Sequence, residues 1–350
     1  LDILGHDDPT MIRQLMNYVE AEPEKFPFSK VEDIPLDDKD VLKMFSGVEI
    51  LGVKPEDVLE DIGTTGLPEF GTTLAKDMLK EIRPTTVSDL IKISGLSHGE
   101  GIWNGNMREL FLGMNPNVKN LKFNELIGCR DDIMAYLLSK DLPAIDAFTI
   151  MEGVRKGKGL KKEQEKEMID YGVPKWYIDA CKAIKYMFPK AHATAYVVMA
   201  LRIGWFKLHR PLYYYAGFFS KRADAFEIET MVAGKDAIKA RLKELDEAKK
   251  LTPKEQKVYV SLLLSLEMIS RGFNFKQIDI FKSDWENFVI DGDSLIIPFS
   301  AMDSLGPSIA KSIVDARNDN PFTSKKDVVR RSRINNTLVE KFNRLGIFKD

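Results

Sequence analysis

The sequence predicts a mainly α-helical fold with a minor β component. Apolar residues recur every three or four positions through most of the chain, which is the spacing of amphipathic helices. The clearest helix is predicted at 190–209, because Pro189 precedes its apolar run and Pro211 closes it. Strand character is confined to 274–299, where two apolar runs flank Asp-Gly-Asp at 291–293, a β-hairpin signal.

The N-terminal part of the chain predicts a strand end followed by short helices. Residues 1–5 are apolar apart from one acid and predict the end of a buried strand. At 7–10, acids and a proline precede an apolar-periodic run, as at the start of a helix. The stretch 21–38 is rich in Glu, Pro and Lys and predicts a surface connection, whereas the glycine-rich stretch 63–71 predicts a loop. Further helices are predicted at 40–45, 55–61 and 72–82.

The rest of the chain predicts helices joined by short loops. Residues 86–196 predict a series of helices in which glycines mark loops at 95–105 and 153–159. Two more helices are predicted within 234–272, separated by Leu-Thr-Pro at 251–253. After the hairpin, the last fifty residues return to short helices.

The composition is that of a soluble globular protein long enough for two or three domains. Of 350 residues, 44% are hydrophobic and 30% are charged, which is enough apolar material for a buried core. Cys129 and Cys181 form neither a disulfide framework nor a zinc-ligand spacing, so a reducing, cytoplasmic location is expected. The sequence has no apolar run of membrane-spanning length and no signal peptide, so no membrane partner is expected. Its start without Met, directly in an apolar stretch, indicates a piece of a longer chain.

Charge is unevenly distributed, although the formal net charge is only −2. Residues 1–70 hold 17 acidic and 6 basic residues, whereas residues 154–222 hold 15 basic and 5 acidic residues. Residues 301–350 are also basic, with 10 basic and 6 acidic residues. This pattern is typical of a protein that binds a polyanion along one side, and solvated lysine-rich helices are the alternative.

A helix-hairpin-helix signal begins at 304–311, in the sequence Ser-Leu-Gly-Pro-Ser-Ile-Ala-Lys. A glycine turn at Gly306 opens an apolar helix, so backbone N–H groups would face a DNA phosphate while Lys311 supplies charge. Pro307 and Ser308 stand where the usual second glycine would be, and this removes one backbone N–H donor for a phosphate. A second candidate lies at 323–346, and a pair of ordinary basic helices is the alternative. The candidate DNA-binding residues are Gly306, Ser308, Lys311, Lys325, Lys326, Arg330 and Arg331.

Two further stretches carry groups that suit an anion. Residues 93–99 combine glycines, hydroxyls and a histidine, and such a loop lets the backbone approach a phosphate, although similar turns are common. The stretch 186–196 places Lys190 in the first turn of the long helix, where a bound anion is favoured. His192 and Tyr196 share one face of that helix, and packing in the core is the alternative role for such a histidine.

One acid stands inside the apolar start of the chain. Burial of Asp2 in a strand would be costly unless it is paired or binds a metal. Fraying of the terminus is the alternative, because Asp2 is the second residue.

These stretches occur in one order along the chain: LDILGHDDPTMIR, GLPEFGT, ISGLSHG, IGCRDDIM, VRKGKGL, KYMFPKAHATAY, FVIDGDSLIIPF and LGPSIAKSIV. Together they resemble the C-terminal third of the C-family replicative DNA polymerases of the PolC type, over essentially the whole chain. The chain departs from the family at 100–104, where Glu-Gly-Ile-Trp-Asn replaces the usual sequence.

The resemblance implies a domain order and two cofactor ions. Residues 1–19 would be a palm remnant, 20–215 the fingers and 216–350 a duplex-binding region with tandem helix-hairpin-helix elements at about 295–350. In the family, three palm aspartates hold two Mg²⁺ ions, and the resemblance assigns the third to Asp2, as the catalytic and metal-binding residue of this chain. The other two aspartates would lie upstream, so the chain alone is expected to be inactive.

The resemblance also implies the substrates and partners. They are primer-template DNA, a dNTP and, in the full-length protein, the replisome and the sliding clamp. The residues expected to surround the dNTP are Gly95, Ser97, His98, Arg130, Lys185, Phe188, Lys190, His192 and Tyr196.

Two functions fit the sequence. The first is a fragment of a DNA-directed DNA polymerase that performs template-directed nucleotidyl transfer in the full enzyme. The second is a non-catalytic helix-hairpin-helix module that binds DNA without any nucleotide pocket. The stretches 95–99 and 185–196 favour the first, because a duplex-binding module would not need them.

Overall fold

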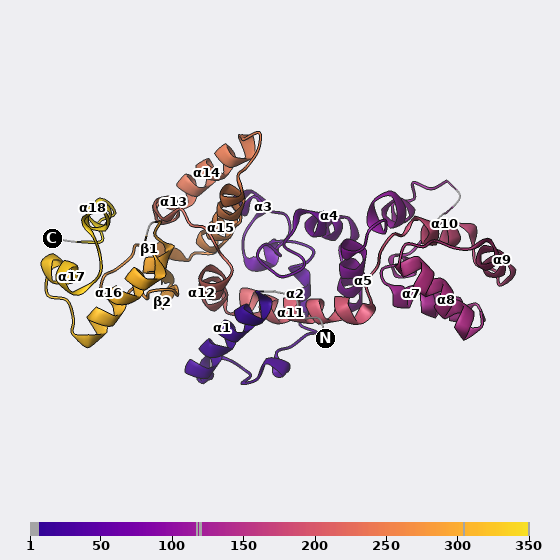
Figure 1. The fold of residues 1–350 in the computed structure, drawn as a ribbon, viewed down its shortest axis with the longest axis horizontal. Helices are drawn as coiled ribbons and strands as arrows, with labels where there is room; N and C mark the ends of the chain where they lie inside the picture. The colour runs from indigo at the N-terminus through magenta and orange to yellow at the C-terminus, as the bar shows by residue number, and fades with distance from the viewer. Residues whose placement is uncertain (1–6, 117, 119–120, 304, 349–350) are drawn as a thin grey trace. The chain divides into compact units, whose positions relative to one another are not determined.

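A computed structural model describes residues 7–116, 118, 121–303 and 305–348 (Figure 1). The chain divides into two compact units. Unit 1 comprises Leu1–Pro35, Val48–Gly66 and Arg202–Asp350, and unit 2 comprises Leu36–Gly47 and Leu67–Leu201. The boundaries predicted from the sequence separate a palm remnant, fingers and a duplex-binding region. These are functional regions and not compact units, so their boundaries stay a prediction. The predicted strand end at 1–5, with Asp2, lies outside the described residues.

The described part of unit 2 is helical apart from an isolated bridge between Glu100 and Tyr186. Its helices are α2 (Lys39–Lys43), α4 (Thr73–Ile82), α5 (Val87–His98), α6 (Arg108–Phe111), α7 (Arg130–Ser139), α8 (Ala144–Arg155), α9 (Lys162–Asp170), α10 (Lys175–Ala183) and residues 190–201 of α11 (Lys190–His209).

Side-chain caps explain where two of these helices begin. The Thr72 hydroxyl accepts a hydrogen bond from the Ala75 N–H at the start of α4. Thr86 and Asp89 form a reciprocal capping box at the start of α5. Such a cap stabilises a helix by about 1 kcal/mol, because it satisfies N–H groups that have no partner within the helix.

The predicted glycine loop at 95–105 is wrong in its first part, because α5 continues through Gly95 and Ser97 to His98. Gly95 is buried in the helix, and a Cβ atom there would lie 2.4 Å from the carbonyl oxygen of Gly128. The glycine therefore allows close packing of α5 against the segment before α7 and does not form a turn.

Two other glycines, Gly101 and Gly157, pack against the backbone at the end of α10 and in the linker between α10 and α11, residues 184–189. A Cβ atom at Gly101 would lie 2.4 Å from the Ala183 carbonyl oxygen, and one at Gly157 would lie 2.2 Å from that of Lys185. Gly101 and Gly157 also have positive φ angles, 72° and 66°, which glycine adopts without strain. The α10–α11 linker is therefore fixed by backbone packing, and its last residues lead directly into α11.

The regular elements of unit 1 are helices and one small sheet. The helices are α1 (Asp8–Ala21), α3 (Pro55–Val58), the remainder of α11, α12 (Pro211–Lys221), α13 (Ile228–Ala233), α14 (Lys235–Glu247), α15 (Pro253–Ser270), α16 (Pro307–Asp319), α17 (Lys325–Arg331) and α18 (Asn336–Arg344). The mainly α fold with minor β is thus confirmed, and the boundaries of α11 agree with the prolines that bracket it.

The predicted hairpin is also confirmed. Strands β2 (Val289–Asp291) and β3 (Ser294–Ile296) pair in antiparallel fashion, with Asp291 opposite Ser294. Gly292 has a φ of 68° in the turn, a conformation that favours glycine. Strand β1 (Asn274–Lys276) pairs with β3 in parallel, which gives the order β1-β3-β2.

The stretch 21–38 is more than the surface connection that its polar composition predicts. Phe26 and Phe28 are buried in unit 1, and their rings lie 5.8 Å and 5.7 Å from that of Phe206. Phe28 also packs edge-on against Trp205 at 4.8 Å. The two phenylalanines therefore anchor this stretch to α11.

An ion pair is completely buried in unit 1. The Lys207 ammonium on α11 is 0% exposed and lies 3.0 Å from the Glu267 carboxylate on α15. It also donates hydrogen bonds of 2.7 Å to the carbonyl oxygens of Gly63 and Thr65. The Tyr215 hydroxyl donates to the second Glu267 oxygen at 2.5 Å. The network thus joins α11, α12 and α15 to the loop at 63–66.

Candidate nucleotide site and duplex-binding region

The start of α11 lies against the start of α7 within unit 2. The Arg130 N–H donates to the carbonyl oxygen of Phe188 at 3.2 Å, and the Lys190 N–H donates to the Asp131 carboxylate at 2.6 Å. The N–H groups of His192 and Ala193 bond to the Pro189 carbonyl oxygen. The protein itself therefore occupies N–H groups that the sequence predicted for an anion, and anion recognition here depends on side chains.

Lys190 offers such a side chain. It is exposed, and its ammonium group forms no ion pair with any residue that the structure describes. Other cations of this surface have acidic neighbours: Lys185 lies 3.3 Å from Glu100, and Arg130 lies 3.9 Å from Glu152. Lys190 is thus the predicted cation with its charge most available to a ligand.

A row of rings lies beside Lys190. The Phe188 and His192 rings stack with centroids 4.5 Å apart, and His192 lies 4.7 Å from Tyr196. His98, from α5, meets Phe188 edge-on at 6.1 Å and His192 at 6.2 Å. We call these four residues, His98, Phe188, His192 and Tyr196, the ring cluster. It brings together residues that are up to 98 positions apart in the sequence.

His98 has polar partners on both ring nitrogens. Its Nε2 lies 3.0 Å from the Glu69 carboxylate, and its Nδ1 lies 2.8 Å from the Ser94 carbonyl oxygen. The Ser97 hydroxyl is also 2.9 Å from Nδ1. The hydrogen bond to Glu69 raises the pKa of His98 above its ordinary value. Both ring nitrogens therefore already have polar partners within the protein, and neither offers a free N–H group to a phosphate nearby.

The Glu152 carboxylate on α8 has several cations around it. The carboxylate bonds to Arg155 and lies 2.9 Å from Lys156, and these hydrogen bonds lower its pKa to about 2. The Arg130 guanidinium also lies near this acid, 3.9 Å from its carboxylate, while the Arg130 backbone N–H bonds to Phe188 of the ring cluster.

The structure brings together most of the residues predicted for the nucleotide. Ser97, Arg130 and Lys190 lie next to the ring cluster. Gly95 has a packing role in α5, and the Lys185 side chain points to Glu100 on the exposed side of the α10–α11 linker.

Sequence reasoning missed two acids of this site, Glu69 and Asp131. Glu69 stands between Pro and Phe in the GLPEFG stretch, and an acid among apolar and glycine residues is a signal that could have identified it. Asp131 lies at the start of a helix, where acids are common for helix stability, so the sequence offers no comparable signal.

At the helix-hairpin-helix candidate, the predicted helix begins directly after Gly306. Gly306 is the N-cap of α16, and its carbonyl oxygen accepts from the N–H groups of Ile309 and Ala310. Ser308 and Lys311 are both exposed and are three residues apart on this helix, so they share a face.

The basic residues of α17 differ in their surroundings. Lys326 is exposed, whereas the Arg331 guanidinium is 18% exposed, lies 3.1 Å from Asp327 and bonds to the carbonyl oxygens of Ala316 and Asn320. Arg330 also pairs with Asp327, at 2.9 Å. Arg331 therefore joins α16 to α17 and is largely used within the fold.

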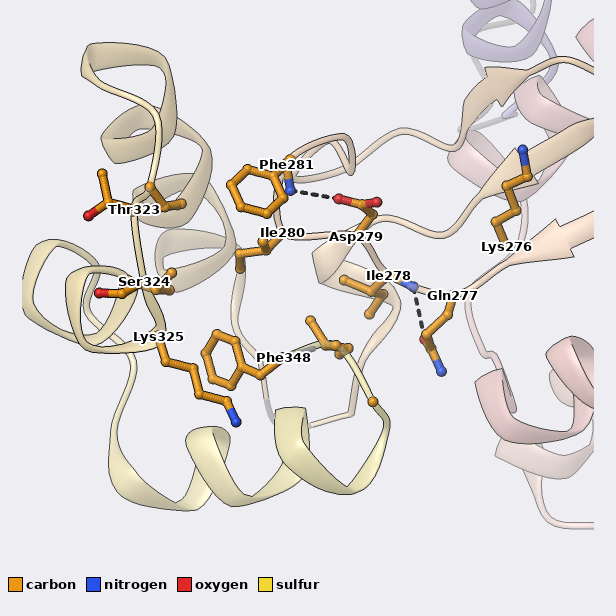
Figure 2. A pocket seen from close by; sticks show the side chains of 14 residues that line it. Lys276, Gln277, Ile278, Asp279, Ile280, Phe281, Thr323, Ser324, Lys325 and Phe348 are labelled. Carbon is orange, nitrogen blue, oxygen red and sulfur yellow. Dashed lines mark hydrogen bonds between the residues drawn. The ribbon is translucent and has the colours of Figure 1, made fainter. Parts of the chain in front are cut away.

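Lys325 lines a groove on unit 1 with a volume of about 460 Å³ (Figure 2). Its ammonium lies 5.6 Å from the centre of the Phe348 ring, and Figure 2 shows the two side chains next to each other. Phe281, on the segment that follows β1, also lines the groove and is 58% exposed.

The described residues contain neither a cluster of metal ligands nor a membrane-spanning helix. Within the described ranges, no group of three or more His, Cys, Asp or Glu side chains lies close enough together to hold a metal ion. Asp2, which the family resemblance assigns to the magnesium site, lies outside the described residues, so the magnesium site stays a prediction. No helix in the described part of the chain has the length and apolar character needed to span a bilayer.

Comparison with known proteins first defines a class. The model for the bacterial DNA polymerase III alpha subunit finger domain matches residues 8–175, and a helix-hairpin-helix model matches residues 272–350. The chain thus combines polymerase fingers with a helix-hairpin-helix region.

Individual relatives then define the family. The chain is 49% identical to the PolC-type DNA polymerase III of Listeria innocua over 97% of its length, and 50% identical to that of Oceanobacillus iheyensis over 97%. It is 49% identical to the PolC-type DNA polymerase III of Bacillus subtilis over 99% of its length. The chain belongs to the PolC-type DNA polymerase III family, and it spans 23% of the length of each of these relatives.

Proposed function

We propose that the ring cluster and Lys190 form part of the site where a PolC-type polymerase binds the incoming dNTP. The observation that carries this proposal is the exposed ammonium of Lys190, without an acidic partner among the described residues, beside four rings drawn from two distant segments. A triphosphate needs cations, and a base needs flat apolar surfaces, so the combination suits a nucleotide. Arg130 adds a second cation close to the same helix start.

In this proposal the whole polymerase performs template-directed nucleotidyl transfer in the cytoplasm. Two Mg²⁺ ions, held in part by Asp2, would activate the primer 3′-hydroxyl and stabilise the leaving pyrophosphate. Lys190 and Arg130 would hold the triphosphate, and Phe188 and Tyr196 would pack near the nascent base pair. The replisome and the sliding clamp would be partners of the full-length protein.

The first test concerns activity. We expect no primer extension by the purified 350-residue chain, because the family resemblance assigns two of three metal-binding aspartates to sequence outside it. The measurement is extension of a labelled primer with Mg²⁺ and all four dNTPs, with a full-length PolC-type polymerase as the positive control. Synthesis by the chain alone would contradict the assignment of Asp2 to a site completed elsewhere.

We further propose that the region around α16 and α17 binds the DNA backbone. The helix-hairpin-helix match, together with exposed Ser308, Lys311 and Lys326, supports this assignment. Arg331 would contribute by joining the two helices and not by contacting DNA, because its guanidinium already bonds within the fold.

The second test measures this binding. Replacing Lys311 and Lys326 with Ala should weaken binding of duplex DNA equally for different sequences. If each lysine neutralises one phosphate, the slope of log affinity against log salt should fall by about 1.8, since each contact contributes about 0.9. Fluorescence anisotropy of a labelled duplex at several salt concentrations provides the measurement.

The matched control replaces two exposed lysines of unit 1 outside this region, Lys243 and Lys250. Equal salt slopes for the two double variants would move the duplex site away from α16 and α17. The basic stretch at 154–222 would then be the next candidate.

A further inference from the structure

Glu69 is held in an unusual position in the loop before α4. Its φ is +67°, in the left-handed region that residues with a side chain rarely adopt. Its side chain is only 9% exposed and points to α5, where one oxygen, Oε2, lies 3.0 Å from His98 Nε2 and accepts from the Ser94 hydroxyl at 3.2 Å. Ser94 is itself buried. A carboxylate with so little solvent contact needs a cation or several donors as compensation.

The geometry around His98 indicates which protonation state provides that compensation. The Ser94 carbonyl oxygen can only accept a hydrogen bond, so Nδ1 at 2.8 Å must carry a proton. The Glu69 carboxylate also accepts, so Nε2 must carry one too. With both nitrogens protonated, the ring is an imidazolium. The Ser97 hydroxyl donates to the Ser94 carbonyl oxygen and therefore does not require Nδ1 as an acceptor.

Lys190 and Arg130 lie next to the ring cluster, but neither cation forms a hydrogen bond or a cation–π contact with His98. Phe188 presents its ring edge-on from the α10–α11 linker, and His192 presents a second imidazole from α11 at 6.2 Å. The hydrogen-bonding partners of His98 among the described residues are Glu69 from the loop and Ser94 and Ser97 from α5. The raised pKa of His98, caused mainly by its hydrogen bond to Glu69, agrees with this reading of the contacts.

We propose that Glu69 is a positioning residue for the nucleotide site: it holds His98 as an imidazolium whose ring fixes Phe188 and His192 beside Lys190. This inference rests on the proposed function of the ring cluster. Glu69 touches neither nucleotide nor metal in this arrangement. It acts through His98, which places a fixed positive charge behind the rings that would pack against the substrate.

The inference is tested first without any nucleotide, by NMR titration of the histidine side chains in the 350-residue chain. The chain has only four histidines, so a His98→Gln variant identifies the His98 signals. We expect wild-type His98 to titrate above its ordinary pKa of about 6.5, and Glu69→Gln to lower that pKa by about one unit or more, a tenfold loss of proton affinity. Glu100→Gln, which removes an exposed acid that pairs with Lys185, should leave it unchanged.

The wild-type titration alone tests whether the protein holds His98 as an imidazolium. A His98 pKa at or below the ordinary value would overturn the proposal, whether or not the Glu69 variant folds. An equal His98 pKa in wild type and Glu69→Gln would also overturn it. Because no nucleotide is present, neither result affects the assignment of Lys190 to the dNTP site.

A second measurement tests the link to the nucleotide. In the full-length polymerase, Glu69→Gln should raise the KM for dNTP by about tenfold, as expected when one charge-assisted contact that fixes a site is lost. This increase in KM should be smaller at low pH, where His98 is protonated without help from Glu69. An unchanged KM in a variant whose His98 pKa has fallen would overturn the positioning role, while the effect of replacing Lys190 would still test the site itself.

Discussion

Replacing Lys207 with Met should lower the free energy of unfolding of this chain by about 3–5 kcal/mol, the cost of breaking one buried ion pair. The substitution leaves the Glu267 carboxylate, 3% exposed, without its cation. It also leaves the carbonyl oxygens of Gly63 and Thr65 without the ammonium donor that binds both at 2.7 Å. Urea denaturation followed by circular dichroism provides the measurement.

Two further variants distinguish the loss of stability caused by removing the buried Lys207 from the effect of removing any lysine. Lys243→Met removes an exposed lysine of unit 1 that lies 3.9 Å from Glu247, and it should change stability by less than about 1 kcal/mol. Adding Glu267→Gln to Lys207→Met should recover part of the loss, because no unpaired charge then remains buried. Equal unfolding midpoints for Lys207→Met and Lys243→Met would contradict a stabilising role of the buried network.

The buried pair also gives stability a defined pH dependence. Burial lowers the pKa of Lys207 to about 8, below the ordinary lysine value of 10.5. The folded protein therefore binds this proton less tightly than the unfolded chain does. The contribution of this group to stability should rise as the pH increases from about 8 toward 10.5, and at pH 7 the lysine remains charged.

Replacing Lys190 with Ala in a full-length PolC-type polymerase should lower kcat/KM for dNTP about 30–150-fold. Loss of one charge-assisted contact to a phosphate costs about 2–3 kcal/mol, which corresponds to that range. The fold should tolerate the change, because the Lys190 side chain is exposed and forms no ion pair among the described residues. Steady-state incorporation of a single dNTP provides the measurement.

The matched control is Lys182→Ala. Lys182 is an exposed lysine of the same unit, near the end of α10, and it lies 2.9 Å from Glu165. Its removal takes away the same charge without touching the ring cluster, so kcat/KM should change less than about threefold, the effect of a surface ion pair.

The elements with strong local signals could be predicted from the sequence. Pro189 and Pro211 bracket α11 because proline cannot continue a helix from the preceding turn, and the structure places the helix at Lys190–His209. The hairpin at 289–296 follows from a glycine in a tight turn between two apolar runs. Both depend on residues close to one another in the chain.

The structural roles of some glycines and aromatic residues could not be predicted, because contacts with distant parts of the sequence determine them. The sequence predicts a loop at Gly95, but the residue lies in α5, where the lack of a side chain leaves room for the Gly128 backbone. Phe26 and Phe28 lie in a polar stretch, yet Trp205 and Phe206 on α11 provide the apolar surface that buries them. Local composition carries no information about either partner.

The candidate site shows the same limit. The family resemblance identified the segments that meet at the start of α11, but spacing alone could not require that His98 and His192 lie 6.2 Å apart. Asp131 and Glu69 escaped prediction because each acts on a residue brought near it only by the fold. The sequence predicts that an anion is favoured at the start of α11, and the Asp131 carboxylate of the protein itself accepts from the first N–H group there.

The central claim is that the start of α11, with the ring cluster, contacts the dNTP. Single-turnover incorporation, with dNTP titrated against preformed polymerase and primer-template, tests it most directly, because it separates dNTP affinity from the rate of chemistry. The account predicts a weaker apparent dNTP affinity, a slower maximal rate or both for Lys190→Ala, and wild-type values for Lys182→Ala. Wild-type affinity and rate for Lys190→Ala would contradict the claim, and the helix-hairpin-helix region would then be the better supported function of this chain.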